Sequence, residues 1–409
     1  MKNLVILGAG TGGTLMANKL ARALSPAEWR IILVDRDDDH IYQPGLLFVP
    51  FGLNDPKDLV RPRRRFLPSG AELCLSGAEA VDPVARVVHL RDGAKLSFDV
   101  LIVATGARLV PEETAGLTGP GWYRDAFDFY TLAGATALAR RLERFKHGRV
   151  VVNVVDMPIK CPVAPLEFLF LADAYFTQRG VRDAVEIVYA TPLDGAFTKP
   201  RASAAFGHLL AEKGVTVQPD FQVASVDSDA RTLRAYDGRA IDYDVLVSVP
   251  AHQGSAVISN SGLGDDFGFL PTDRQTLQSR DHENIFALGD ATDLPTSKAG
   301  SVAHFQGEVL IENVLRFIGG KALVPGFDGH ANCFVETGHG KAILIDFNYD
   351  TEPLPGRFPL PGIGPFTLLE ESAVNHWGKL AFRWLYWNLL LLGRELPIEH
   401  RMQMAGKWS

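Results

Sequence analysis

The sequence predicts an α/β protein with two Rossmann-like dinucleotide-binding domains, followed by an amphipathic C-terminal region. Three observations predict this class. A strand, a glycine-rich turn, a helix and a second strand open the chain; a similar series of elements recurs after about residue 145; and the last 80 or so residues are rich in Pro, Gly and aromatics. The length of 409 residues allows two or three domains, and 46% hydrophobic with 22% charged content is typical of a folded chain.

The first βαβ unit follows from hydrophobic patterning. The apolar run 4-LVIL-7 predicts a buried parallel strand, 14-TLMANKLARAL-24 has helical periodicity, and 31-IILVD-35 predicts the second strand. The strand-rich stretch 86–106 follows, with a hairpin expected at Asp92-Gly93.

The second half repeats this order. A helix is expected at 132–145, a strand at 150–155, a helix from about Leu166 and a strand at 185–190. The hairpin-rich run 223–250 repeats the pattern of residues 80–106, which suggests two related domains. The chain then returns through 284-NIFALGDAT-292 and a helix across about 299–318. We predict an FAD domain (1–110 and 280–325), a second Rossmann-like domain (111–279) and a C-terminal region (326–409).

Composition excludes several classes of function. A net charge of −7 disfavours nucleic acid as a partner, and the basic cluster 61-RPRRR-65 favours a solvated loop over a headgroup site. Three cysteines cannot form a disulfide framework, and none has zinc-ligand spacing, so no metal site is predicted. No signal peptide and no uncharged run of transmembrane length is visible, so we expect the protein to fold in the cytoplasm.

The segment 8-GAGTGG-13 matches the G-x-G-x-x-G pattern in its required context between a strand and a helix. Gly8 permits the tight turn, Gly10 lets the backbone approach a pyrophosphate, and Gly13 allows close helix packing. Asp35 ends the next strand, where a carboxylate can accept hydrogen bonds from a ribose diol.

Two later segments favour FAD over NAD. The stretch 101-LIVATGA-107 resembles the ATG motif of flavoproteins with two dinucleotide domains, and 284-NIFALGD-290 resembles their second flavin motif. The resemblance implies non-covalent FAD, held also by residues of these segments and of the strand near residue 81: Val81, Ala104, Thr105, Gly106, Gly289 and Asp290.

The second domain lacks the glycine turn that NADH-dependent relatives carry. Its equivalent stretch, 150-VVVNVVDMPIKCPVAPLEF-168, contains no glycine. Side chains on the turn would block a pyrophosphate, and prolines remove backbone donors. Cys161 instead occupies a turn at a strand C-terminus, where α/β sheets bind ligands, so we expect a functional thiol.

The order of GAGTGG, ATGA, C-P-x-A-P-x-E-F, FALGD, S-K-A-G and a late C-F pair resembles sulfide:quinone oxidoreductases and the flavoprotein subunit of flavocytochrome c sulfide dehydrogenase. These belong to the disulfide-reductase type of fold, and the resemblance covers essentially the whole chain. It implies two redox thiols that bind sulfide and hold polysulfur beside the flavin, Cys161 and Cys333. Glu167 resembles a proton-handling carboxylate and Lys298 a lysine facing the flavin pyrimidine end. Phe334 and Phe366 are the implied quinone residues.

The chain also departs from that family. Many members carry a third redox cysteine after the ATG motif, and 117-LTGPGWYRDAFDF-129 contains none. The remaining thiol, Cys74, is expected to be a buried spectator. Tyr42 stands where flavocytochrome c has a flavin-linking cysteine, which argues against a covalent flavin and against that relative. The missing thiol leaves polysulfur length open, and also whether sulfide is the sole substrate.

The segment 376-HWGKLAFRWLYWNLLLLGRELP-397 predicts an amphipathic helix lying in a bilayer interface. Its interface-seeking residues would be Trp377, Phe382, Trp384, Tyr386 and Trp387, and an ordinary core or oligomer helix is the alternative. 379-KLAF-382 resembles the corresponding family helix. We therefore expect a peripheral membrane protein, with the cytoplasmic face favoured, that forms homo-oligomers.

The leading hypothesis is an enzyme that oxidises sulfide, or a related small persulfide, and reduces membrane quinone. The enzyme alternative is a type II NADH:quinone oxidoreductase, which would need nucleotide binding at 150–168. The non-enzyme alternative is a flavin-bearing redox sensor or assembly partner that keeps the fold without turnover.

Overall fold

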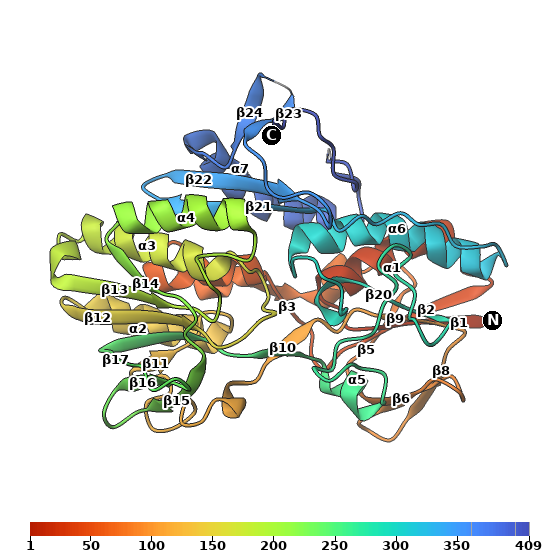
Figure 1. Cartoon of the computed structure of the whole chain (residues 1–409). Helices are drawn as coiled ribbons and strands as arrows, with labels where there is room; N and C mark the ends of the chain where they lie inside the picture. The colour runs from red at the N-terminus through yellow and green to blue at the C-terminus, as the bar shows by residue number, and fades with distance from the viewer. Residues whose placement is uncertain (361, 397, 409) are drawn as a thin grey trace.

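The N-terminal part of the chain forms an open parallel sheet. The computed structural model describes residues 1–360, 362–396 and 398–408. The sheet has the order β20-β9-β1-β2-β5, and each neighbouring pair is parallel. Its strands are β1 (Lys2–Leu7), β2 (Trp29–Val34), β5 (Glu72–Cys74), β9 (Val100–Val103) and β20 (Ile285–Ala287), and helices α1 (Thr11–Ala23) and α6 (Gly300–Ile318) pack together beside it. The apolar runs predicted as central strands therefore lie in the sheet interior (Figure 1).

A second parallel sheet repeats this order. It runs β11-β18-β12-β13-β14 and is also parallel throughout. Its strands are β11 (Ala126–Phe127), β12 (Gly148–Val154), β13 (Val185–Ala190), β14 (Val215–Gln218) and β18 (Val245–Val249). Helices α2 (Leu132–Arg144), α3 (Ala164–Gln178) and α4 (Pro200–Glu212) accompany it, on the left of Figure 1.

The predicted internal duplication extends to the appended hairpins. Each large sheet has a three-stranded antiparallel sheet inserted between two of its strands, between β5 and β9 in the first and between β14 and β18 in the second. These are β6 (Ala78–Asp82), β7 (Val87–Leu90) and β8 (Lys95–Ser97) in the first half, and β15 (Val223–Asp227), β16 (Thr232–Ala235) and β17 (Ala240–Asp242) in the second. The repeated D-G turns and hairpins of the sequence thus correspond to one repeated architecture.

Short elements complete the two halves. The antiparallel pair β10 (Ala107–Leu109) and β19 (His252–Gly254) lies between the two large sheets in Figure 1. A small ribbon of β3 (Asp39–Ile41) and β4 (Val60–Pro62) and the short helix α5 (Ala256–Asn260) belong to connecting segments. The predicted domain limits at 110, 279 and 325 stay a prediction.

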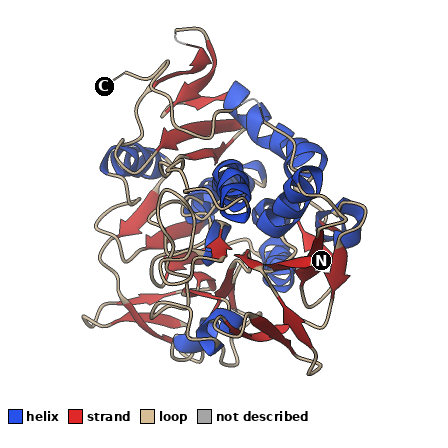
Figure 2. Cartoon of the chain, turned by 90° about the vertical axis from the view of Figure 1, so that its right-hand side faces the viewer, coloured by secondary structure: helices blue, strands red, loops and turns tan. Residues whose placement is uncertain are grey.

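The C-terminal part forms a third layer above the two sheets (Figures 1 and 2). No strand was predicted there, yet the described residues between 331 and 372 build a five-stranded sheet. Its strands are β21 (Ala331–Gly338), β22 (Lys341–Phe347), β23 (Gly356–Leu360), β24 (Gly364–Leu368) and β25 (Glu371–Ser372). Helix α7 (Ala373–Leu385) follows and continues into the π-helical turn η7 (Tyr386–Leu390).

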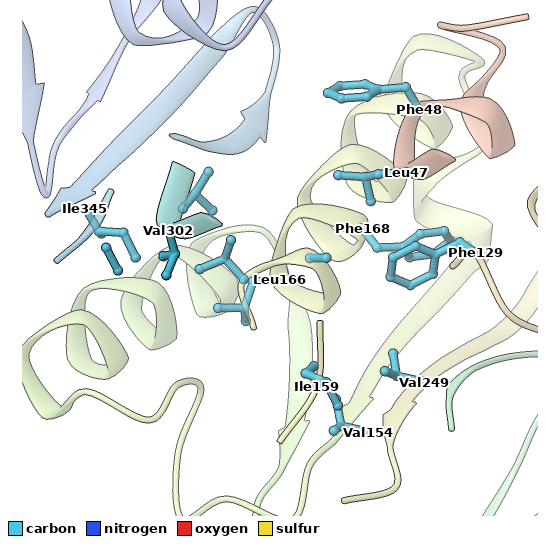
Figure 3. Close-up of a cluster of buried hydrophobic side chains, with 14 of the residues drawn as sticks. Leu47, Phe48, Phe129, Val154, Ile159, Leu166, Phe168, Val249, Val302 and Ile345 are labelled. Carbon is cyan, nitrogen blue, oxygen red and sulfur yellow. The ribbon is translucent and has the colours of Figure 1, made fainter. Parts of the chain in front are cut away.

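One apolar core joins these layers. Figure 3 shows Leu166 of α3, Val302 of α6 and Ile345 of β22 close to one another, and all three are essentially inaccessible. Phe168 of α3 stacks on Phe129 at a ring separation of 5.0 Å. Because the core is continuous, residues from all three layers are held in fixed positions around α3.

The C-terminal helix differs from its prediction in length and orientation. The α-helix ends at Leu385, and Tyr386 and Trp387 are buried rather than available to a bilayer. The Tyr386 hydroxyl lies 2.7 Å from His40 Nε2 and 2.7 Å from Thr11 Oγ1, beside the N-terminal glycine turn. The π-helical turn directs these aromatics inward, so the expectation that all five aromatics face lipid is wrong for these two.

The basic cluster 61–65 is also less solvated than expected. Arg63 donates to the carbonyls of Ala9 and Asp37, each at 2.9 Å, and its side chain is largely buried. The Arg61 guanidinium lies 4.4 Å from the Trp387 ring centroid. Arginines bury when carbonyls and aromatic faces replace water, which composition alone does not reveal.

Asn375 fastens α7 to β24 and gives a test of this packing. Its side chain is fully buried, accepts from Thr367 N–H at 3.2 Å and donates to Thr367 O at 2.8 Å. Asn375→Ala leaves buried backbone groups without partners, so we expect a loss of about 2 kcal/mol in unfolding free energy, measured by urea denaturation. The matched control is Asn388→Ala, whose exposed amide donates only to Trp384 O. Equal urea midpoints of unfolding for the two variants would contradict this role of Asn375.

Candidate functional site

The N-terminal glycine turn has the geometry of a pyrophosphate cradle. Gly8 has φ +93°, and an added Cβ would lie 2.4 Å from Ala104 O. A Cβ on Gly13 would lie 1.8 Å from Gly8 O, so only glycine allows α1 to start this close to the strand. A Cβ on Gly10 meets nothing within 4 Å, and this open side is where a phosphate would approach.

Asp35 orders the turn from the end of β2. Its Oδ2 accepts from Ala9 N–H at 2.7 Å, and its Oδ1 accepts from Arg36 N–H at 2.8 Å. Arg63 Nη1 lies 3.4 Å from the same carboxylate, an interaction that the sequence did not predict. Each carboxylate oxygen has a second lone pair, so a ribose diol can still be accepted.

The two later flavin segments, 101–107 and 284–290, also fit FAD. The Thr105 hydroxyl is buried without a hydrogen-bond partner among the described residues, and Gly106 has φ +68° with open space at its Cβ position. Gly289 N–H donates to Gln306 Oε1 at 2.6 Å. This hydrogen bond holds the short turn that follows β20 and contains Asp290. The first turn of α1 carries no acidic residue and no side-chain cap, so its N–H groups are free for an anion.

Val81 is placed differently from the other predicted cofactor residues. Its backbone N–H donates to Ser261 Oγ at 2.7 Å, and its side chain is buried in the core beside the first sheet. Only its carbonyl remains for a cofactor contact. The assignment of Val81 to the FAD site stays a prediction.

The loop after β12 positions Cys161 in place of a glycine turn. Cys161 has φ +48°, a left-handed conformation that costs a non-glycine residue about 1 kcal/mol or more. Its N–H donates to Lys298 O at 2.8 Å, and its carbonyl accepts from Ala164 N–H at 2.8 Å at the start of α3. The two predicted segments 158–168 and 297–300 are therefore bonded to each other.

Cys333 on β21 shares the environment of Cys161. Both are free thiols, both are partly buried, and both pack against the same hydrophobic core. Burial raises the pKa of Cys161, and the nearby charges of Glu167 and Cys333 raise it further. Burial likewise raises the pKa of Cys333 to about 12. In their reduced form both cysteines therefore favour the thiol over the thiolate, and the thiolate is the competent nucleophile.

Glu167 places a carboxylate near the two cysteines. It is fully buried on the first turn of α3, accepts from Lys379 Nζ at 2.7 and 3.0 Å, and accepts from Glu336 N–H at 3.1 Å. Burial raises the pKa of Glu167, while Lys379 opposes that effect. For Lys379, burial is outweighed by the negative Glu167, which raises the pKa of the ammonium. In the sequence, Lys379 lay in the segment 379-KLAF-382, which resembles the corresponding family helix. Nothing in the sequence marked it as the partner of the buried Glu167.

Lys298 is buried below the loop that carries Asp290. Its Nζ donates to Thr292 O at 2.7 Å and Asp290 O at 3.1 Å, and it lies 4.0 Å from the Phe269 ring centroid. Burial lowers the pKa of Lys298 to about 8, although Asp290 opposes this shift. Lys298 therefore fixes the Asp290 loop, and its contact with the flavin ring stays a prediction.

A second buried lysine went unnoticed in the sequence. Lys160 directly precedes Cys161, is nine-tenths buried, and donates to Gln43 Oε1 at 3.3 Å. Burial lowers its pKa, and Asp290 and Asp128 oppose that shift. It adds positive charge to the side of the site where Asp290 lies.

The predicted quinone residues form an aromatic corner beneath α7. Phe334 of β21 and Phe366 of β24 are half-buried and meet edge to face with centroids 5.3 Å apart. A Cβ on Gly378 would lie 2.7 Å from the Phe334 ring and 2.8 Å from the Phe366 ring. Glycine at 378 therefore lets α7 approach both rings, next to Lys379.

The remaining residues of interest lie apart from this cluster. Cys74 ends the edge strand β5, paired with Val34, and packs partly buried against the core beside the first sheet. Tyr42 is buried and meets Tyr386 at 4.8 Å. No group of three or more His, Cys, Asp or Glu side chains in the described part of the chain is arranged to hold a metal ion.

Gly10→Val tests the cofactor cradle. The added side chain has room in the folded protein but fills the approach to the turn, so we expect about tenfold or more loss of bound flavin with unchanged folding. The measurements are the flavin-to-protein absorbance ratio and the thermal unfolding of cofactor-stripped protein. Gly207→Val on α4, where a Cβ also meets open space, is the control. Full flavin content in Gly10→Val would refute this location.

Comparison with known proteins agrees with this geometry. Residues 2–153 match the family described as pyridine nucleotide-disulphide oxidoreductase. The mitochondrial sulfide:quinone oxidoreductase of Mus musculus is 26% identical over 95% of this chain and 86% of its own. That of Dictyostelium discoideum is 28% identical over 96% of this chain and 86% of its own.

A solved structure shows the same fold. The X-ray structure of the sulfide:quinone oxidoreductase from Aquifex aeolicus matches with a TM-score of 0.79 at 19% identity, covering 96% of this chain and 92% of that chain. The resemblance inferred from the motifs is thereby confirmed. Over nearly its whole length the chain is similar to sulfide:quinone oxidoreductases, and it shares its fold with the solved one.

Proposed function

We propose that this protein is a flavoenzyme of the membrane surface that oxidises sulfide and reduces quinone. The observation that carries the proposal is the pair of thiols around the start of α3: Cys161 stands in the turn after β12, where a nucleotide site would carry glycines, and Cys333 on β21 packs against the same core. The aromatic corner of Phe334 and Phe366 lies next to it along β21 and β24. Sulfur chemistry and quinone binding therefore have adjacent but separate positions.

The thiol pair suits the capture of a soft sulfur nucleophile. Hydrosulfide attack on a Cys161–Cys333 disulfide breaks the S–S bond, leaving a persulfide on one cysteine and a thiolate on the other. FAD, bound at the glycine turn, supplies the two-electron acceptor between sulfur and quinone. Lys379 lies near Cys161 and stabilises a thiolate there, since its charge lowers the pKa of that thiol. A small persulfide could replace hydrosulfide in this step with the same bond changes.

In this proposal Glu167 accepts the S–H proton of the persulfide that this attack leaves. It lies close enough to both cysteines for its charge to raise both of their pKa values. Its two oxygens are held by Lys379 and the Glu336 N–H, so the carboxylate has a fixed orientation. A fixed base at a buried thiol contributes roughly 10²- to 10⁴-fold to rate.

The loop geometry disfavours the NADH-dependent alternative. Cys161 N–H is already used by Lys298 O, and Pro158, Pro162 and Pro165 cannot donate. The start of α3 therefore offers few backbone donors to a pyrophosphate. A non-catalytic flavin sensor remains the other alternative, and turnover distinguishes it.

Cys161→Ser is the direct test of the thiol assignment. We expect sulfide to bleach the flavin of the wild-type protein anaerobically, and sulfide:quinone turnover to fall by roughly 10³-fold or more in the variant, as for a lost nucleophile. Cys74→Ser is the matched control and should keep wild-type activity. NADH should not bleach any of the three proteins. Equal turnover of Cys161→Ser and Cys74→Ser would refute the assignment, and wild-type protein inert to sulfide would favour the sensor.

An apolar face on the third layer supports docking to a bilayer. The face consists of Val374, Trp377, Leu380 and Trp384 on α7, together with Leu360 and Ile363 on the β23–β24 hairpin, all exposed. The α7 residues recur every three or four positions, so they share one side of the helix. β23, β24 and α7 all lie in the top layer of Figure 1. Among the described residues, no helix has the length and hydrophobicity to cross a membrane.

This apolar face also relates to quinone access. Gly378 borders the aromatic corner from the helix that carries the exposed tryptophans, and Phe366 of the corner belongs to the same β23–β24 hairpin as Leu360 and Ile363. A quinone leaving the lipid would therefore reach the corner without crossing water. Peripheral attachment, its cytoplasmic side and homo-oligomerisation remain parts of the proposal.

Removal of the two exposed tryptophans tests membrane docking. Trp377→Ala with Trp384→Ala should weaken binding to lipid vesicles by about 10-fold or more, measured by co-sedimentation, because two large apolar side chains no longer enter the interface. Tyr236→Ala, which removes a still more exposed aromatic at the β16–β17 turn, is the control. Unchanged vesicle binding of the double variant would contradict the docking face.

A further inference from the structure

The chain segment that follows α7 runs along the helix that begins at the glycine turn. Residues 386–393 comprise η7 and the turn after it, and they form hydrogen bonds with three side chains of α1: Thr11, Asn18 and Arg22. These α1 positions are seven and four residues apart, so they lie on one side of the helix. The segment therefore accompanies α1 from its first residue to its last turn.

The contact at the first residue of α1 is a pair of short hydrogen bonds. Tyr386 Oη lies 2.7 Å from Thr11 Oγ1 and 2.7 Å from His40 Nε2. Tyr386 and His40 are both buried. Burial lowers the pKa of His40 to about 3, so the imidazole is neutral. The Thr11 hydroxyl, the Tyr386 hydroxyl and the His40 ring thus form a buried chain of neutral hydrogen bonds.

Farther along α1, helix side chains hold the backbone of the segment. Asn18 Nδ2 donates to Leu391 O at 3.0 Å, and Arg22 Nη1 donates to Leu392 O at 2.9 Å. A Cβ on Gly393 would lie 3.0 Å from a backbone carbonyl oxygen of α1, and Gly393 has φ +62°. Glycine at this position therefore lets the chain pass close to the helix.

Aromatic packing fixes the segment from another side. The Trp387 ring stacks on Phe66 with centroids 5.0 Å apart, and the Arg61 guanidinium lies 4.4 Å from the Trp387 ring centroid. Four buried residues of the segment share a hydrophobic cluster with apolar side chains between Tyr42 and Phe66. The segment therefore packs on the same part of the chain that carries the glycine turn.

Thr11 stands where this packing meets the cofactor turn. It is the fourth residue of 8-GAGTGG-13 and the first residue of α1, whose N-terminal N–H groups are free for the expected pyrophosphate. Hydrogen bonds are directional, so these N–H groups bind a phosphate well only when the first turn has a fixed orientation. The bond from Tyr386 restricts Thr11 before the cofactor arrives, which lowers the entropy cost of binding.

We propose that Tyr386 is a positioning residue for FAD, and that cofactor binding and the packing of residues 386–393 on α1 stabilise each other. Tyr386 acts through Thr11 and does not touch the cofactor. The coupling is a free energy shared by two sites, so it is reciprocal. The packed segment tightens FAD binding, and bound FAD holds the segment against the helix by the same factor. The inference concerns FAD binding alone and does not depend on sulfide or quinone as substrates.

A double-mutant cycle on FAD affinity tests the coupling. Cofactor-stripped protein is titrated with FAD, and the dissociation constant is measured from the change in flavin fluorescence. Tyr386→Phe removes only the hydroxyl, so we expect the dissociation constant to rise by roughly three- to tenfold, as for one lost hydrogen bond. Thr11→Val should have a similar effect, and the double variant should bind no more weakly than either single variant, because both remove the same bond. Thr11→Ser keeps the hydroxyl and should bind FAD as the wild type does.

Hydrogen exchange measures the reciprocal effect. Amide exchange within residues 386–393 should slow severalfold when FAD binds, because the bound cofactor holds the segment on α1. This protection should be smaller in Tyr386→Phe. Exchange in α4 of the second half should not respond to FAD and serves as the internal reference.

Tyr243→Phe is the matched control variant. It removes a buried tyrosine hydroxyl of the second half that has no hydrogen-bond partner among the described residues, so FAD affinity should match wild type. A purely structural role of Tyr386 would lower the thermal unfolding midpoint of stripped protein and leave the FAD dissociation constant unchanged, and that result would overturn the proposal. Additive effects of Tyr386→Phe and Thr11→Val, or equal exchange of 386–393 with and without FAD, would also overturn it. None of these measurements uses sulfide or quinone, so failure here is separate from failure of the proposed reaction.

Discussion

The buried ion pair between Glu167 and Lys379 is the interaction on which this architecture depends. It joins α3 of the second sheet to α7 of the C-terminal layer, and it adds a contact to the backbone of β21 through Phe334 O and Glu336 N–H. Removing one partner of such a pair leaves an unpaired buried charge, at a cost of about 3–5 kcal/mol. The pair therefore fixes the distance between Cys161 at the start of α3 and Cys333 on β21.

This constraint explains how a duplicated nucleotide fold can serve two chemistries. The first copy keeps an open glycine turn, with Gly10 facing unoccupied space and α1 uncapped. The second copy keeps the parallel sheet and the strand-to-helix turn, but fills the turn with Cys161 in a left-handed conformation and bonds it to Lys298 O. A site that would hold a diffusible nucleotide becomes a rigid position for a thiol.

The C-terminal layer completes the site from the outside. One side of α7 directs Lys379 and His376 inward to carboxylates, and the other exposes Trp377 and Trp384. The following π-helical turn places Tyr386 against Thr11 at the dinucleotide turn. This short helix and the turn that continues it therefore contact both the thiol site and the start of α1, while the outer side of the helix is exposed.

The sequence by itself determined the parallel strands, the glycine turn with Asp35, the second flavin motif and the glycine-free turn that carries Cys161. Each depends on local patterning, since buried parallel strands are continuous apolar runs and a phosphate turn needs glycine at fixed spacing. The resemblance also supplied Cys333, Glu167 and Lys298 as predicted site residues.

Only the tertiary structure decided the partners of charged and aromatic residues. Lys379 and Arg63 read in sequence as ordinary surface cations, yet one pairs with Glu167, 212 positions away, and the other donates to Ala9 O, 54 positions away. Tyr386 and Trp387 read as interface aromatics but lie in the core. Whether such amphipathic side chains turn toward solvent or interior depends on what the fold brings opposite them, and local sequence carries no record of that.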